Sequence, residues 1–108
     1  MGEVLDLNKF LPLTETTYYT MLALIEPTHG YAVMQQTEAT SQGTVTIGPG
    51  TMYGIFSTLE KQGLIRLAKE EDRRKCYLLT DKGKKVLKEH IRRLEIMAQN
   101  GVDVLEKL

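Results

Sequence analysis

Apolar residues are distributed along the chain in short clusters, and their spacing predicts which secondary structure each cluster forms. Five residues near the N-terminus predict a short amphipathic helix that ends at Pro12, namely Val4, Leu5, Leu7, Phe10 and Leu11. From Thr14 to about Glu26 the chain is almost continuously apolar, which is typical of a helix buried on most sides. Thr14 is the expected N-cap of this helix.

Pro27 ends the first long helix, and Thr28 or His29 opens a second that runs to about Thr40. We expect Tyr31, Val33 and Met34 to face inward. The β-branched alternation from Thr44 to Ile47 predicts a very short strand.

The next segment predicts a helix with one apolar stripe. Gly48-Pro49-Gly50 interrupts the chain, and Thr51 is the expected helix cap. The stripe consists of Met52, Ile55, Phe56 and Leu59, spaced i, i+3, i+4 and i+7. Gly63 is a typical helix stop.

A charged hairpin follows this third helix. Residues 64–69 and 75–80 predict two strands that are joined through residues 70–74. Short helices followed by one hairpin give a mainly α chain with a small β wing, an α+β arrangement. The order is that of a winged helix-turn-helix.

Thr80 is expected to cap a long C-terminal helix, which carries an apolar residue at alternating intervals of four and three. This heptad spacing lets two helices pack along one seam. The seam residues are Leu87, Ile91, Leu94, Ala98, Gly101, Leu105 and Leu108. We therefore predict a winged helix-turn-helix domain with an N-terminal helical arm at residues 1–83 and a homodimerisation helix at residues 84–108. Gly101 either ends the helix or admits a close partner.

Composition is consistent with one ordinary globular domain, since 42% of the 108 residues are hydrophobic and 26% are charged. The single cysteine, Cys76, has no internal disulfide partner. No apolar run is long enough for a membrane span, and no signal pattern opens the chain. We expect a cytoplasmic protein.

The net charge of zero hides an uneven distribution. Residues 60–93 contain twelve lysines and arginines against six acids, whereas residues 1–59 contain one lysine against five acids. Such a basic segment can face phosphates, although it can equally be a solvated helix surface.

Two elements carry the candidate DNA contacts. The third helix presents small and polar groups opposite its apolar stripe, and such a face suits a major groove. The hairpin tip presents consecutive cations, which can follow the DNA backbone or enter a minor groove. The candidate residues are Thr51, Tyr53, Ser57, Lys61, Arg73, Arg74 and Lys75. The alternatives are an ordinary amphipathic helix, and a solvated turn in which three neighbouring acids pair with the cations.

Five strings in this order make the chain resemble the PadR family of transcriptional regulators. They are His29-Gly30-Tyr31, Pro49-Gly50-Thr51-Met52-Tyr53, Leu59-Glu60-Lys61-Gln62-Gly63-Leu64-Ile65, Arg73-Arg74-Lys75-Cys76-Tyr77 and Leu79-Thr80-Asp81-Lys82-Gly83. The resemblance implies a winged-helix repressor that binds a pseudo-palindromic double-stranded DNA operator as a homodimer. It also implies that some members release DNA when small aromatic molecules bind. The wing segment resembles MarR-like regulators as well, although those chains are usually longer.

Other chemistry finds little support in the sequence. His29, His90 and Cys76 have no metal-ligand or nucleophile spacing, so we predict no enzyme activity, no metal and no cofactor. We expect His29 to serve a helix start and His90 to be partly exposed or at the dimer edge. Four residues are assigned to the core rather than to an effector cavity: Tyr18, Tyr19, Met21 and Phe56. The functional alternative is a dimeric winged-helix adaptor that binds protein and not DNA.

Overall fold

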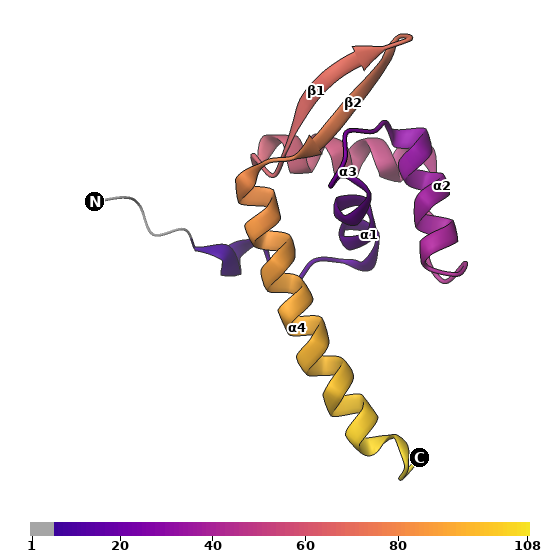
Figure 1. The fold of residues 1–108 in the computed structure, drawn as a ribbon, viewed down its shortest axis with the longest axis vertical. Coiled ribbons are helices and arrows are strands. Elements are labelled where there is room, and N and C mark those ends of the chain that lie inside the picture. The colour runs from indigo at the N-terminus through magenta and orange to yellow at the C-terminus, as the bar shows by residue number, and fades with distance from the viewer. Residues whose placement is uncertain (1–5) are drawn as a thin grey trace.

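The computed structural model describes residues 6–108, in which a group of helices supports a β-hairpin and one long helix extends away from them (Figure 1). Val4 and Leu5 of the predicted N-terminal helix lie outside the described residues. The elements are η1 (Leu7–Phe10, a 3-10 helix), α1 (Glu15–Ala23), α2 (Gly30–Thr40), α3 (Pro49–Lys61), β1 (Ile65–Glu71), β2 (Arg74–Leu79) and α4 (Asp81–Leu105). The predicted winged-helix architecture, mainly α with one hairpin, is confirmed.

Side chains cap the N-termini of three of the four α-helices, α1, α2 and α4. Thr14 Oγ1 accepts the N–H of Thr17 at 3.2 Å, and Thr80 Oγ1 accepts the N–H of Gly83 at 3.0 Å, as predicted. Helix α3 begins at Pro49 with Gly48 as its N-cap, so the expectation that Thr51 caps it is wrong. The fixed φ of proline suits the first position of a helix, and α3 therefore starts three residues earlier than predicted.

The segment between α2 and α3 is extended but is not a strand, contrary to the prediction for Thr44 to Ile47. The Ser41 hydroxyl binds the backbone of Val45 twice, accepting its N–H at 3.0 Å and donating to its carbonyl at 3.2 Å. Val45 and Ile47 point into the core. The alternation therefore reflects burial of every second residue on a connection that has no neighbouring strand.

The core lies between α1, α2, α3, the base of the hairpin and the first turns of α4. Met21, Val33 and Leu64 have no exposed surface. Tyr31 is 57% exposed, so its predicted inward orientation is wrong. Residues two apart on a helix lie about 200° apart, and burial of Val33 turns Tyr31 towards solvent.

A tight backbone junction joins α3, β1 and α4. Gly63 ends the helical region with φ +74°, as its predicted role as a stop requires. The Thr80 N–H donates to Leu64 O at 3.0 Å, and the Thr80 hydroxyl donates to Gly63 O at 2.6 Å. At Gly83, a Cβ would stand only 2.1 Å from Leu64 O. Glycine thus permits α4 to begin directly against the start of the wing.

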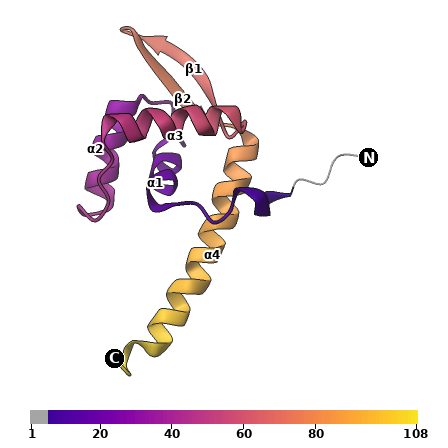
Figure 2. The same ribbon diagram turned by 180° about the vertical axis from the view of Figure 1, so that it is seen from behind.

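The hairpin is longer and its turn is tighter than predicted. Strands β1 and β2 are antiparallel and pair Glu71 with Arg74, leaving only Asp72 and Arg73 in the turn. Both turn residues have positive φ, +52° and +66°, which matches the twist of a two-residue hairpin. The tip therefore projects away from the helices (Figures 1 and 2).

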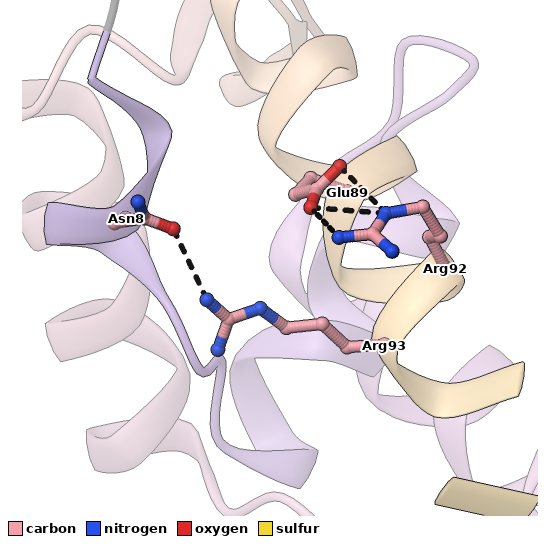
Figure 3. Close-up of polar contacts among 4 residues, drawn as sticks. All are labelled: Asn8, Glu89, Arg92 and Arg93. Atoms are coloured by element: carbon pink, nitrogen blue, oxygen red, sulfur yellow. Dashed lines mark hydrogen bonds and ion pairs between the residues drawn. The ribbon is translucent and has the colours of Figure 1, made fainter. Parts of the chain in front are cut away.

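Helix α4 is continuous through Gly101, and its C-terminal half leaves the rest of the chain (Figure 1). Every residue from Glu95 onward is exposed. Near the point of departure, Arg93 donates to the Asn8 side chain of η1 at 3.1 Å, while Arg92 pairs with Glu89 within the helix (Figure 3). No helix within residues 6–108 combines the length and apolar character that a membrane span needs.

His90 is buried, with 4% of its surface exposed, so the expectation that it is partly exposed is wrong. Its Nδ1 accepts the Leu13 N–H at 3.3 Å, and its ring lies 5.2 Å from that of Tyr18. Burial, followed by the charge of Arg93, lowers the pKa of His90. The neutral imidazole is therefore the folded form.

This burial predicts a loss of stability in acid. Because the folded pKa lies below the unfolded value of 6.5, the unfolded chain binds the proton first. The contribution of His90 is complete above pH 6.5 and is lost as the pH falls towards the folded pKa, by at most about 1.4 kcal/mol per pH unit. Urea unfolding at pH 7.5 and 5.0 measures it. In His90→Asn, which keeps an acceptor for Leu13, the difference between the two pH values should shrink; an equal difference would contradict the assignment.

Candidate nucleic-acid interface

A groove of about 600 Å³ opens between α3, the start of α2 and the wing. It brings together five of the seven predicted DNA-contact residues, which are Tyr53, Ser57, Arg73, Arg74 and Lys75. Thr51 and Lys61 do not line it. Residues of the helix and of the hairpin, about 20 positions apart in the sequence, thus line the same groove.

Tyr77 on β2 holds the three walls of this groove together. Its backbone pairs with Thr28, with N···O distances of 2.8 and 3.1 Å, which attaches the wing to the residue before the α2 cap. Its ring meets Phe56 of α3 edge-on, with centroids 5.3 Å apart. The Leu79 N–H also donates to Leu24 O at 2.9 Å. The wing is therefore fixed relative to both helices.

The outermost ridge of α3 is made of small residues. Gly50, Gly54 and Ser57 follow one another at intervals of four and three, and Lys61 continues the ridge. Around Gly50 and Gly54 there is open space for 4 Å beyond a Cβ position. The backbone of α3 can therefore approach a flat or grooved partner closely.

Thr51 lies on a different flank of α3. With Gly54 and Thr58 it borders a second depression of about 420 Å³, whose other side includes Thr14 and Thr17. The predicted outer face of α3 is thus divided: Tyr53 faces the wing, and Thr51 faces the start of α1. Lys61 is exposed in the last turn.

The three tip cations of the wing, Arg73, Arg74 and Lys75, form no ion pair among the described residues. Among residues 6–108, the two ion pairs are Lys69–Glu71 at 3.0 Å and Arg92–Glu89, and neither involves the tip cations Arg73, Arg74 and Lys75. The hydrogen bond and charge of Glu71 raise the pKa of Lys69. Two acids, Glu60 and Glu70, line the groove beside the cations. The groove therefore has three exposed cations, which would attract a phosphate, and two carboxylates, which would repel it.

Tyr31 and His29 also line the groove, although neither was among the predicted contacts. Tyr31 is exposed and receives a hydrogen bond from Gln35 at 3.2 Å, and His29 contacts Arg74 at 3.2 Å. The His29-Gly30-Tyr31 string signalled a helix start, and His29 does cap α2 by accepting the Ala32 N–H. Only the folded hairpin brings Arg74 beside it.

The predicted dimer seam divides into two halves. Leu87 belongs to the buried core, and Ile91 packs partly against that core, so both already have partners in this chain. Leu94 is half-buried, whereas Ala98, Gly101 and Leu105 are exposed. Four further apolar residues of this half are exposed and were not predicted, namely Ile96, Met97, Val102 and Val104.

The remaining candidates for chemistry have structural positions. Cys76 is a buried free thiol on β2. Met21 and Phe56 lie in the core, and Tyr18 and Tyr19 pack against it. Residues 6–108 contain no group of three histidine, cysteine or acidic side chains suited to a metal ion.

Comparisons with known proteins find similarity to transcriptional regulators. The family model described as "Transcriptional regulator PadR-like family" matches residues 10–89. The transcriptional regulator YqjI of Escherichia coli (strain K12) is 31% identical over 74 residues, which are 68% of this chain and 36% of that protein. The chain thus spans about a third of the length of the curated relatives it matches first.

Solved structures show the same relationship. A transcriptional regulator from Clostridium thermocellum has a TM-score of 0.67 at 25% identity, over 86% of this chain and 90% of that one. A PadR family regulator from Eggerthella lenta DSM 2243 has a TM-score of 0.64 at 27% identity, over 82% and 75%. ZitR of Lactococcus lactis, a zinc-responsive MarR family member, has a TM-score of 0.67 at 21% identity over 100% and 72%, a likeness of fold alone.

Proposed function

The chain belongs to the PadR-like family of transcriptional regulators, a family of DNA-binding proteins and not of enzymes, and from that premise we propose that it represses transcription as a homodimer on a pseudo-palindromic operator. The observation that carries the proposal is the groove in which Tyr53 and Ser57 of α3 meet the unpaired cations of the wing. Such a protein must share the compartment of its DNA, so the proposal includes a cytoplasmic location.

Helix α3 is the proposed major-groove element. Its ridge of Gly50, Gly54 and Ser57 lets the backbone enter a groove about 12 Å wide, with Tyr53 beside the ridge and Lys61 at its end. Thr51, at the opposite flank, is assigned a phosphate near the helix start, and the cations Arg73, Arg74 and Lys75 of the wing are assigned the neighbouring backbone or minor groove.

The C-terminal half of α4 is the proposed dimer surface. Met97, Val102 and Leu105 are each more than half exposed, and on one chain nothing among the described residues covers them. In a two-fold dimer with antiparallel α4 helices, this half would pack on the first half of the partner's α4. An apolar groove lined by Leu7, Ile25, Leu87 and Ile91 lies there, with a volume of about 610 Å³.

Charge supports the antiparallel arrangement. Three lysines border the groove at the start of α4, namely Lys84, Lys85 and Lys88. The last 15 residues carry three acids against one lysine. A two-fold axis would place each acidic end beside the partner's basic start, and each contact would occur twice. This arrangement keeps the predicted seam. Leu87 and Ile91 of one chain would contact residues 94–105 of the other chain.

Selection of bound sequences from a random pool of duplex DNA tests the proposal. Repeated enrichment of one two-fold-symmetric site is expected, and its affinity should fall steeply with salt because several phosphates are neutralised. Recovery of no DNA, together with a stable complex with another protein, would instead support the adaptor alternative.

Two substitutions test the assigned DNA face. Tyr53→Ala and Arg74→Ala should each weaken binding to the selected operator by about 10- to 100-fold, the effect of losing one well-placed contact of about 1–3 kcal/mol. Both side chains are exposed, so the fold and the dimer should persist. Fluorescence anisotropy measures the affinity, with Lys107→Ala as an exposed-cation control far from the groove. Unchanged affinity in both variants would contradict the assignment.

Release of DNA by a small aromatic effector, implied for some family members, stays a hypothesis for this chain. Adding a phenolic acid to the protein–operator complex tests it: a dose-dependent loss of anisotropy would support an effector. Constant anisotropy would contradict an aromatic effector and would leave the proposal of DNA binding unchanged.

A further inference from the structure

The imidazole of His29 has two hydrogen-bond donors as neighbours. Its Nδ1 lies 3.3 Å from the Ala32 backbone N–H, and its Nε2 lies 3.2 Å from Arg74 Nη1. A guanidinium only donates, and so does a backbone N–H. A neutral imidazole has one accepting nitrogen, and a protonated imidazole has none. At most one of these two contacts is therefore a hydrogen bond, and in the other contact two donors face each other.

The backbone decides which contact is satisfied. The Ala32 N–H is held in place by the first turn of α2, and it has no intrahelical acceptor there. Arg74, by contrast, is an exposed side chain that can turn away. Nδ1 thus accepts from Ala32, and Nε2 carries a hydrogen that points towards the guanidinium of Arg74.

A single acceptor placed between two converging donors would satisfy both of them. Glu71 and Asp72 border the same small pocket, but neither forms an ion pair with Arg74 within the described residues. The donors belong to two different elements, α2 and β2, and the Thr28–Tyr77 backbone pairing fixes these elements relative to each other. The backbone pairing therefore holds the two residues side by side, and the exposed Arg74 side chain is free to turn towards a ligand at this point.

We propose that His29 and Arg74 together bind one phosphate oxygen of the DNA backbone, with His29 donating through Nε2–H. This inference rests on the proposed function and adds a contact from α2 to those of α3 and the wing. The two residues line the same groove as Tyr53 and Ser57, so a phosphate at this point would adjoin DNA held by α3. The positive end of the α2 helix favours an anion there as well. His29 is thus both the cap of α2 and a positioning contact for the duplex.

His29→Asn separates the two roles. Asparagine is a good N-cap and preserves the acceptor for Ala32, but it lacks a donor at the position of Nε2. Affinity for the selected operator should fall about 10- to 150-fold, the loss expected for one hydrogen bond to a charged group, with an unchanged melting temperature. His29→Ala should lower both, since it removes the cap too.

A double-mutant cycle with Arg74→Ala tests the shared phosphate. Because both donors serve one oxygen, the double variant should lose less affinity than the product of the two single losses. Arg74→Ala should also reduce the salt slope by about one phosphate, whereas His29→Asn should leave it unchanged at pH 8. Replacing individual operator phosphates by neutral methylphosphonates should identify one position at which both substitutions lose their effect.

The outcomes distinguish this inference from the proposed function. If the unaltered protein selects no DNA, both are overturned. If it binds its operator and His29→Asn binds equally well, or the two losses multiply, the shared phosphate site alone is overturned. Competition by inorganic phosphate at millimolar concentration, with no methylphosphonate effect, would assign the site to a free anion and likewise overturn it.

Discussion

Leu105→Asp is expected to convert the protein to monomers and to reduce operator affinity by at least about 100-fold. Leu105 is 63% exposed on α4, so an aspartate there is fully solvated in a single chain and leaves its fold intact. In the proposed dimer the same carboxylate would be buried on an apolar surface without a partner, which costs several kcal/mol, and it would occur twice. Loss of the second half-site then removes half of the DNA contacts.

Sedimentation equilibrium and operator anisotropy measure the two effects. Asn100→Asp is the matched control, because it adds the same charge to the exposed half of α4 about 140° around the helix from Leu105. It should remain dimeric. Ile91→Asp is a less specific test, since Ile91 also packs against the core of its own chain. A dimeric Leu105→Asp protein with full affinity would show that this face of α4 is not the interface.

Gly83→Ala is expected to destabilise the fold by about 3 kcal/mol, near the upper end of overpacking effects. The added Cβ would lie 2.1 Å from Leu64 O and 3.0 Å from Leu64 C, so backbone would have to move. That carbonyl is held by the Thr80 N–H, and Thr80 also caps α4. Relief of the clash therefore requires separating α4 from the wing.

Chemical unfolding measures this loss, with Gly54→Ala as control. Gly54 lies in the interior of α3 with open space around its Cβ position, and alanine there should stabilise the chain by up to about 1 kcal/mol. Opposite signs for the two variants would show that close approach, and not glycine flexibility, accounts for Gly83. Equal small effects would contradict the tight junction.

Local sequence signals predicted most of the secondary structure. Thr14 and Thr80 cap the helices they were expected to cap, and Gly63 ends α3 with a positive φ, because these effects act within one helical turn. Two of the errors concern local structure. Thr51 lost the cap to Gly48 because Pro49 already satisfies the first helical position, and the alternation at Thr44–Ile47 had no strand to pair with.

The amino-acid sequence by itself determined the order of helices and hairpin, the caps, and the candidate face of α3, since each depends on residues a few positions apart. Burial of His90, outward rotation of Tyr31, and the division of the α4 seam into a buried and an exposed half were decided by tertiary packing. So was the meeting of His29 with Arg74, 45 positions apart. Periodicity shows which residues share a face, but only the packed chain shows what that face meets.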